Sequence, residues 1–192
     1  EKELRCLGEA LSDPRRPFAA VLGGVKVSDK IAVIENLIPR VDRLVIGGAM
    51  AYTFFKAMGK PVGRSLVEDD KLDAARDSMA RASRRGLELL LPSDHVVAEK
   101  VEPGAPTETL SVDSAAIGKR MGLDIGPEAS AAYARALRDA RTVVWNGPMG
   151  VFEVPPFHIG TRLVAEGLAM GSAVSVIGGG STAEAIAQLG LA

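Results

Sequence analysis

The chain has 192 residues, of which 47% are hydrophobic and 24% are charged, with a formal net charge of -1. This composition is typical of one globular domain, and the charge offers no general attraction to nucleic acid or anionic membranes. No apolar run approaches the roughly 20 residues that a membrane-spanning helix needs. The single cysteine, Cys6, cannot form an internal disulfide, so we expect a reducing, cytoplasmic setting. The chain starts at Glu1 rather than at methionine, which suggests a processed chain or a piece of a longer one.

Short apolar runs alternate with amphipathic stretches along the whole chain, an order typical of a parallel sheet covered by helices on both faces. We therefore predict the α/β class, with a Rossmann-like parallel sheet as the middle of three layers. In chain order, we expect a linker at residues 12–17, strands at 18–23 and 43–47, a helix at 69–85, strands at 87–91 and 96–98, a loop at 102–109, a helix from Pro127, a strand at 142–145, a helix at 162–170 and a strand at 173–178.

Glycines follow four of the expected strands, in the strings LGGVK, IGGAM, WNGPMG and IGGGST. In an open parallel sheet the carboxyl ends of the strands lie along one edge, where such sheets bind ligands. Glycine there lets backbone N–H groups approach an anion closely, and the next helix directs its positive end toward the same place. The pattern favours a phosphate ligand, although each turn by itself could be glycine closing a tight connection.

The string GGVKVSDK places Lys26 and Lys30 four residues apart, and we expect a helix to begin near Ser28 or Asp29 as N-cap. Lysine near a helix start is electrostatically unfavourable, so two of them indicate an anion to neutralise; the alternative is a solvated surface pair. The Walker A pattern GxxxxGK[ST] is absent from the sequence.

Two further strings suggest parts of a nucleotide site. The run GGGST at residues 178–182 leads into a short helical pattern, which Ser181 or Thr182 could cap. The segment VVWNGPMGVFE ends in Glu153, a carboxylate that could accept ribose hydroxyls; alternatively the segment is a loop with Trp145 in the core. His95 and His158 have no metal-ligand spacing, and we expect both to be structural.

The chain contains, in this order, the strings LGGVKVSDKI, VIENL, IGGAMAYTF, SLVEDDKLDAA, LLLPSD, MGLDIGP, TVVWNGPMGVFE and IGGGST. In these strings, nearly the whole chain resembles the C-terminal, nucleotide-binding domain of phosphoglycerate kinase. The resemblance implies an interdomain-type helix and linker at residues 1–15 and a nucleotide-binding α/β domain at residues 16–192. It also implies that the N-terminal domain and the final glycine-rich segment of the family are missing from this chain.

The resemblance further implies a role for each site residue. Lys26 would neutralise the charge of the phosphoryl group during its transfer, and Lys30 would bind the nucleotide phosphates. Glu153 would hold the ribose, and Asn146 would lie near the phosphates. The other residues implied to bind nucleotide are Gly24; Gly47, Gly48, Gly122 and Leu123 around the adenine, with Pro148 and Val151 on its other side; and Gly179, Gly180, Ser181 and Thr182 at the phosphate and metal end.

The implied activity is phosphoryl transfer between 1,3-bisphosphoglycerate and ADP in glycolysis, with Mg²⁺ bound to ADP or ATP. By the resemblance, 3-phosphoglycerate binds only through the missing domain, so we expect the chain alone to be inactive. We also expect a monomer without nucleic-acid or membrane partners. The family usually has aspartate where this chain has Ser181, a poorer magnesium ligand, and often glycine in place of Ala49. The alternative is therefore a non-catalytic nucleotide-binding module with an impaired magnesium site.

Overall fold

The computed structural model describes residues 13–190, so the segment of residues 1–12, including Cys6 and most of the expected first helix and linker, lies outside the described residues. Within the described part, a five-stranded parallel sheet has the order β3-β2-β1-β7-β8. This order places the reversal of strand sequence between β1 and β7, as in Rossmann-like sheets. The strands of this sheet are β1 (Phe18–Leu22), β2 (Arg43–Ile46), β3 (Glu88–Leu90), β7 (Thr142–Asn146) and β8 (Val174–Gly178).

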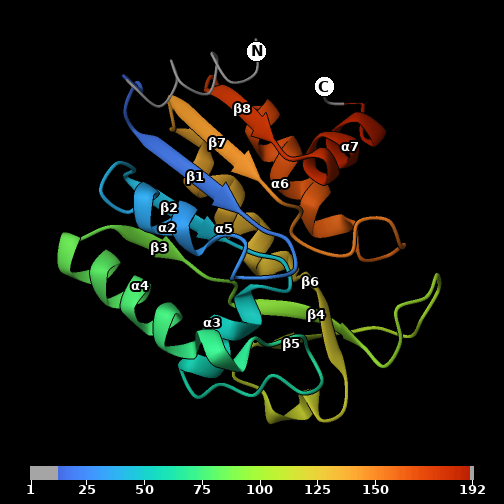
Figure 1. The fold of residues 1–192 in the computed structure, drawn as a ribbon. Helices are drawn as coiled ribbons and strands as arrows, with labels where there is room; N and C mark the ends of the chain where they lie inside the picture. Colours follow the sequence, from blue (N-terminus) through green and yellow to red (C-terminus); the bar gives the residue numbers. More distant parts are fainter. Residues whose placement is uncertain (1–12, 191–192) are drawn as a thin grey trace.

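Helices cover both faces of this sheet, which confirms the predicted three-layer α/β architecture (Figure 1). Side chains of β1 alternate between the two faces, because successive residues of a strand point in opposite directions. Phe18, Ala20 and Leu22 belong to one apolar cluster, whereas Ala19 and Val21 belong to the other. The first cluster includes residues of α2 (Ile31–Leu37), α3 (Ala51–Ala57) and α4 (Leu72–Arg85); the second includes residues of α5 (Pro127–Arg138), α6 (Ile159–Ala169) and α7 (Gly180–Gln188).

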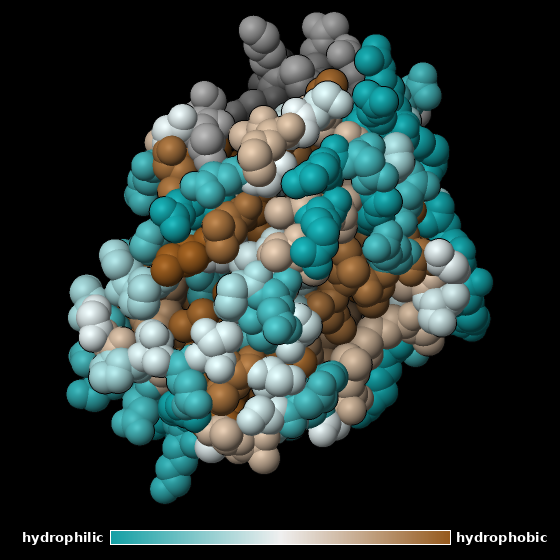
Figure 2. Space-filling view, turned by 180° about the vertical axis from the view of Figure 1, so that it is seen from behind, coloured by the Kyte–Doolittle hydropathy of each residue, from teal (hydrophilic) through white to brown (hydrophobic). Residues whose placement is uncertain are grey.

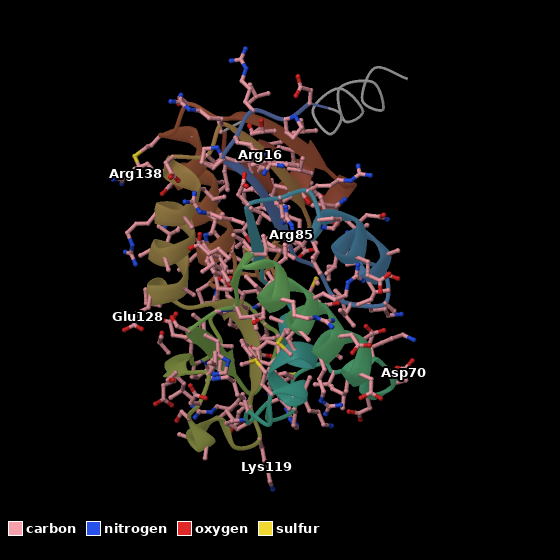
Figure 3. The ribbon with its side chains drawn as sticks, turned by 90° about the vertical axis from the view of Figure 1, so that its left-hand side faces the viewer. Arg16, Asp70, Arg85, Lys119, Glu128 and Arg138 are labelled. Carbon is pink, nitrogen blue, oxygen red and sulfur yellow. The ribbon has the colours of Figure 1, made fainter. Side chains whose placement is uncertain are left out.

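The helix signals at Gly86 and Pro127 correspond to helix ends in the structure. A short 3-10 turn, η1 (Asp69–Lys71), precedes α4, and α4 ends at Gly86, whose left-handed φ of 68° suits glycine. Pro127 opens α5, with Glu128 in its first turn and Arg138 in its last, the charges that the helix dipole favours there (Figure 3). Arg85, near the end of α4, donates hydrogen bonds to the carbonyls of Ile38 and Val41.

A second sheet lies beside the first and was not predicted. It has three antiparallel strands in the order β5-β4-β6. We expected only residues 96–98 as a strand and residues 102–109 as a loop, but β5 starts inside that range. Most side chains of β5 are exposed, so its sequence lacks the apolar run that identifies a buried strand. The strands are β4 (Asp94–Ala98), β5 (Glu108–Ser111) and β6 (Met121–Ile125), with the 3-10 turn η2 (Ala115–Ile117) before β6.

Two helix starts differ from the expectation. The N-cap of α2 is Lys30 rather than Ser28 or Asp29, and no side chain caps it. The helix expected at residues 162–170 begins earlier, at Ile159. Seen from behind, hydrophobic side chains lie recessed near the middle of the molecule, with hydrophilic ones around its margin (Figure 2). Within residues 13–190, none of the helices has the length and apolar character needed to cross a membrane.

Candidate nucleotide-binding site

A cleft of about 650 Å³ lies where β1 and β7 end, between the five-stranded sheet and β6 of the smaller sheet. This is the topological switch point of the sheet, the place where open α/β sheets bind ligands. The structure brings fourteen of the fifteen residues of the sequence-predicted site into the lining of this single cleft. They are Gly24, Lys26, Lys30, Gly48, Gly122, Leu123, Asn146, Pro148, Val151, Glu153, Gly179, Gly180, Ser181 and Thr182.

Backbone hydrogen bonds tie the glycine turns after β1, β2 and β7 together. The amide of Gly24 donates to the carbonyl of Pro148 at 3.0 Å, and the amide of Met50 donates to the carbonyl of Gly24 at 3.1 Å. The amide of Gly48 donates to the carbonyl of Met149 at 3.1 Å. Gly48 has a φ of 68°, and a Cβ there would lie 2.5 Å from the amide nitrogen of Gly24. Any side chain at this position would therefore separate the turns that form the floor of the cleft.

Gly47 is the predicted site residue that does not line the cleft. A Cβ at this position would lie 2.5 Å from the sulfur of Met149, so the residue packs against the buried Met149 side chain. The absence of a side chain at Gly47 allows Met149 to sit under the neighbouring turn. Gly47 thus supports the shape of the cleft from beneath it.

The two predicted lysines reach the cleft from the turn between β1 and α2. The ammonium group of Lys30 donates a hydrogen bond of 2.5 Å to the side-chain oxygen of Asn146 at the end of β7. Burial lowers the pKa of Lys30, while nearby Asp29 acts in the opposite direction. Lys26 lies on the exposed turn and lines the same cleft. Two cationic groups therefore face one cavity, an arrangement suited to a polyanionic ligand.

The glycine triplet joins the same site through Thr182. Gly179, with a φ of 84°, is the N-cap of α7, so the expected capping by Ser181 or Thr182 is wrong. The buried hydroxyl of Thr182 instead accepts a hydrogen bond of 2.6 Å from the amide of Gly147, in the turn after β7. Ser181 is exposed in the first turn of α7 and lines the cleft. The positive end of α7 is thus fixed to the turn that also bears Asn146.

A polar pair, Tyr52 and His95, also lines the cleft and was not predicted as part of the site. Tyr52 and His95 are both buried, and the Tyr52 hydroxyl lies 2.8 Å from Nδ1 of His95. Burial lowers the pKa of His95 to about 4, which favours the neutral ring, and it raises the pKa of the Tyr52 hydroxyl. The two residues lie 43 positions apart, so nothing in the local sequence indicates that they meet.

Asp124, also unpredicted, lies buried at the end of β6 and lines the cleft. Its carboxyl group accepts hydrogen bonds from the amides of Gly160 at 2.7 Å and Ile125 at 2.9 Å. Burial raises the pKa of Asp124 to about 8 despite these two bonds. The only early signal was the string MGLDIGP, in which the aspartate stands among apolar residues.

The loop after β7 closes the site next to β6. The amide of Val151 donates a 2.9 Å hydrogen bond to the carbonyl of Leu123, which places the loop against the strand. Glu153 follows on this loop, exposed and at the margin of the cleft. In residues 13–190, no group of three or more histidine, cysteine, aspartate or glutamate side chains is arranged to hold a metal ion.

Comparisons with known proteins identify the family. The family model described as "Phosphoglycerate kinase" matches residues 1–192. The chain belongs to the phosphoglycerate kinase family. Among curated phosphoglycerate kinases, one from Thermus thermophilus is 56% identical over 192 residues, and that of Herpetosiphon aurantiacus is 54% identical over 192 residues. These alignments cover 100% of this chain but 49% and 48% of the two relatives, so the chain spans about half the length of the curated phosphoglycerate kinases it matches.

Solved structures of phosphoglycerate kinases share the fold. The enzyme from Coxiella burnetii is 42% identical with a TM-score of 0.95, over 99% of this chain and 49% of that one. The enzyme from Pyrococcus horikoshii is 32% identical with a TM-score of 0.82, over 97% of this chain and 47% of that one. The likeness to phosphoglycerate kinase structures therefore extends over both sheets and the cleft between them.

Proposed function

We propose that this chain is the C-terminal, nucleotide-binding domain of a phosphoglycerate kinase and that it binds ADP or ATP. The observation that carries the proposal is the convergence of four glycine turns and two lysines on one cleft at the switch point of the sheet. We assign residues 16–192 to this domain; the interdomain-type helix and linker expected at residues 1–15 lie mostly outside the described residues. In the whole enzyme, a separate domain holds 3-phosphoglycerate.

The phosphates of the nucleotide lie at the end of the cleft where the cationic groups gather. Lys30, held by Asn146, neutralises the nucleotide phosphates, and Lys26 reaches the phosphoryl group in transfer. The N-terminus of α7 faces the same end of the cleft, since Thr182 fixes it to the turn after β7. Such a site accelerates phosphoryl transfer by positioning the reactants and by neutralising charge, without a covalent nucleophile.

The base and ribose lie at the other end, between β6 and the loop after β7. Gly122 and Leu123 form one side of this region, and Pro148 and Val151 form the other. The bond between the Val151 amide and the Leu123 carbonyl sets the spacing of the two sides. Glu153, at the margin, accepts hydrogen bonds from the ribose hydroxyls.

In this proposal, Ser181 contacts a magnesium ion carried on the nucleotide phosphates. Its hydroxyl is a neutral oxygen ligand at the start of α7, and Mg²⁺ commonly combines a few protein oxygens with phosphate oxygens and water. The metal supplies charge neutralisation on the phosphates when it is bound. Because the hydroxyl carries no charge, the alternative function is a nucleotide-binding module with a weakened magnesium site.

Calorimetric titration with ADP tests the proposal directly. Wild-type protein should bind ADP, and Lys30→Ala should weaken binding by about 1 to 3 kcal/mol, because a charge-assisted contact to phosphate is lost. Lys119→Ala is the matched control, since Lys119 is exposed and points away from the body of the protein (Figure 3). Absence of ADP binding to the wild type, or equal effects of the two lysine substitutions, would contradict the proposal.

A further inference from the structure

The carboxyl group of Glu68 holds the turn that carries the two lysines of the cleft. Its Oε2 accepts a 2.9 Å hydrogen bond from the amide of Ser28, and its Oε1 accepts a 2.6 Å hydrogen bond from the Ser28 hydroxyl. Glu68 and Ser28 are 40 positions apart in the chain. One side chain thus takes both donors of a residue that lies between Lys26 and Lys30.

The turn around Ser28 has few other supports. Helix α2 begins at Ile31 with no side-chain hydrogen bond at its N-cap, Lys30. The amide of Lys30 donates to the carbonyl of Val27 at 2.9 Å, and the Val27 side chain is fully buried. Val27 therefore anchors the turn to the core, whereas Glu68 supplies the side-chain hydrogen bonds that fix the direction of the segment leading to Lys30.

Glu68 is itself held in place by hydrogen bonds to helix α3 and to the turn η1. Its amide donates a 3.2 Å hydrogen bond to the hydroxyl of Thr53, a buried residue of α3, and its carbonyl accepts a 3.0 Å bond from the amide of Lys71. Helix α3 follows the glycine turn after β2, which lines the cleft. The bonds from Thr53 through Glu68 to Ser28 therefore connect that turn with the one that bears Lys26 and Lys30.

The ionised form of Glu68 is the one that these bonds favour. Half-burial raises the pKa of the Glu68 carboxyl, but the hydrogen bonds from Ser28 and from the Val27 backbone outweigh it, so that the pKa lies below its ordinary value. At neutral pH the Glu68 side chain is therefore a carboxylate, and each of its two oxygens accepts a hydrogen bond from Ser28.

We propose that Glu68 is a positioning residue for the phosphate-binding lysines and acts on them through Ser28. The inference rests on the proposed nucleotide-binding function. Glu68 does not line the cleft, and its two acceptor atoms are occupied by Ser28, so its role toward the nucleotide is indirect. Without it, the segment from Lys26 to Lys30 would sample more conformations, and ordering it on binding would weaken the affinity for phosphates.

The test is a double-substitution cycle with Glu68→Ala and Lys30→Ala, measured by calorimetric titration with ADP and, separately, with adenosine. Glu68→Ala should weaken ADP binding about five- to tenfold, the effect of losing one or two hydrogen bonds that fix a binding residue. Adenosine carries no phosphate, so its affinity should stay the same. Of the two lysines, Lys30 is the one proposed to contact the phosphates of ADP, whereas Lys26 reaches the phosphoryl group in transfer, which ADP lacks. The double variant should therefore bind ADP no more weakly than Lys30→Ala alone, because Glu68 acts on ADP through Lys30.

Asp77→Ala is the matched control, because Asp77 is an exposed acidic residue on α4. Glu68→Gln, which keeps the size of the side chain, and Ser28→Ala, which removes one of the two bonds, decide the question if Glu68→Ala does not fold. Both should weaken ADP binding by less than Glu68→Ala and leave adenosine binding unchanged.

The outcomes separate this inference from the function it rests on. If the wild type binds no ADP, the proposed function fails. If the wild type binds ADP and Lys30→Ala weakens it, but the Glu68 and Ser28 variants bind like the wild type, only the inference fails. Equal weakening of ADP and adenosine binding would overturn it as well, because that result indicates a general loss of structure. Additive effects in the cycle would also overturn it, because they indicate that Glu68 acts independently of Lys30.

Discussion

The substitution Gly122→Ala would test how tightly the cleft is built against the smaller sheet. Gly122 lies in β6, directly against the ring of Tyr52. A Cβ at Gly122 would lie 1.5 Å from the Tyr52 hydroxyl oxygen and 2.1 Å from the ring carbon that bears it. Real atoms do not approach so closely, so the ring of Tyr52 must move.

The structure gives the cost of that movement. Tyr52 would lose its 2.8 Å hydrogen bond to His95, worth about 1 kcal/mol, and its edge-to-face contact with Phe55, worth about 0.5 to 1.5 kcal/mol. Forcing an extra methyl group into a packed site costs about 1 to 3 kcal/mol more. Gly122→Ala should therefore lower the free energy of unfolding by about 3 to 5 kcal/mol.

Urea denaturation followed by circular dichroism measures this free energy. Gly180→Ala is the control, since a Cβ there meets no atom within 4 Å and the residue lies in the first turn of α7; its stability should stay within about 0.5 kcal/mol of the wild type. Tyr52→Leu removes the ring, so Gly122→Ala should cost far less in that background. The reasoning is refuted if Gly122→Ala is as stable as the control, or if the Gly122 and Tyr52 effects simply add.

Three further predictions concern single side chains. Asp94→Ala should lower the free energy of unfolding by about 2 to 4 kcal/mol, because the buried Asp94 carboxylate accepts hydrogen bonds from two backbone amides at the start of α5. An unchanged midpoint of urea denaturation would contradict this prediction. The pKa of buried His95, about 4 in the folded chain, lies below its ordinary value, so only the unfolded chain takes up the proton as pH falls from about 6.5 to 4. The stability that this difference in pKa contributes is complete above pH 6.5, and about 2 to 3 kcal/mol of it should be lost when the pH falls to 4.5. Urea denaturation at pH 7.5 and at pH 4.5 measures the loss, and the free energy of unfolding of His95→Gln should fall by less between these two pH values. Ser181→Asp should tighten ADP binding at least about threefold over the wild type when magnesium is present, and should not tighten it when a chelator removes the metal. Calorimetric titration measures both affinities, and a variant that binds ADP like the wild type in both conditions would show that residue 181 does not contact the metal.

The larger sheet could be predicted because its strands are apolar in sequence, and its central strands β1, β2 and β7 are largely buried. Each is a short apolar run, and four of them lead into glycine turns, so strand positions and the common edge follow from the sequence. Gly86 and Pro127 marked helix ends for reasons of backbone conformation that act locally. Strands and helix ends that are determined by residues close to them in the chain could therefore be predicted from the sequence.

The rest depends on contacts between distant segments. Strand β5 is largely exposed and is defined by pairing with β4, which no local pattern encodes. The expected N-cap at Ser28 was wrong because that residue bonds to Glu68 instead of to its own helix. Tyr52 and His95 lie on different elements and meet only after the chain has folded.

The position of β1 has a consequence for how the protein comes apart. Every side chain of β1 is fully buried, and alternate residues pack into apolar clusters on opposite sides of the sheet. The two apolar clusters therefore share β1, and unfolding of the helices on either side of the sheet would expose the apolar side chains of β1 to water. Melting should accordingly be a single cooperative step, with the β1 amides among the last to exchange their hydrogens.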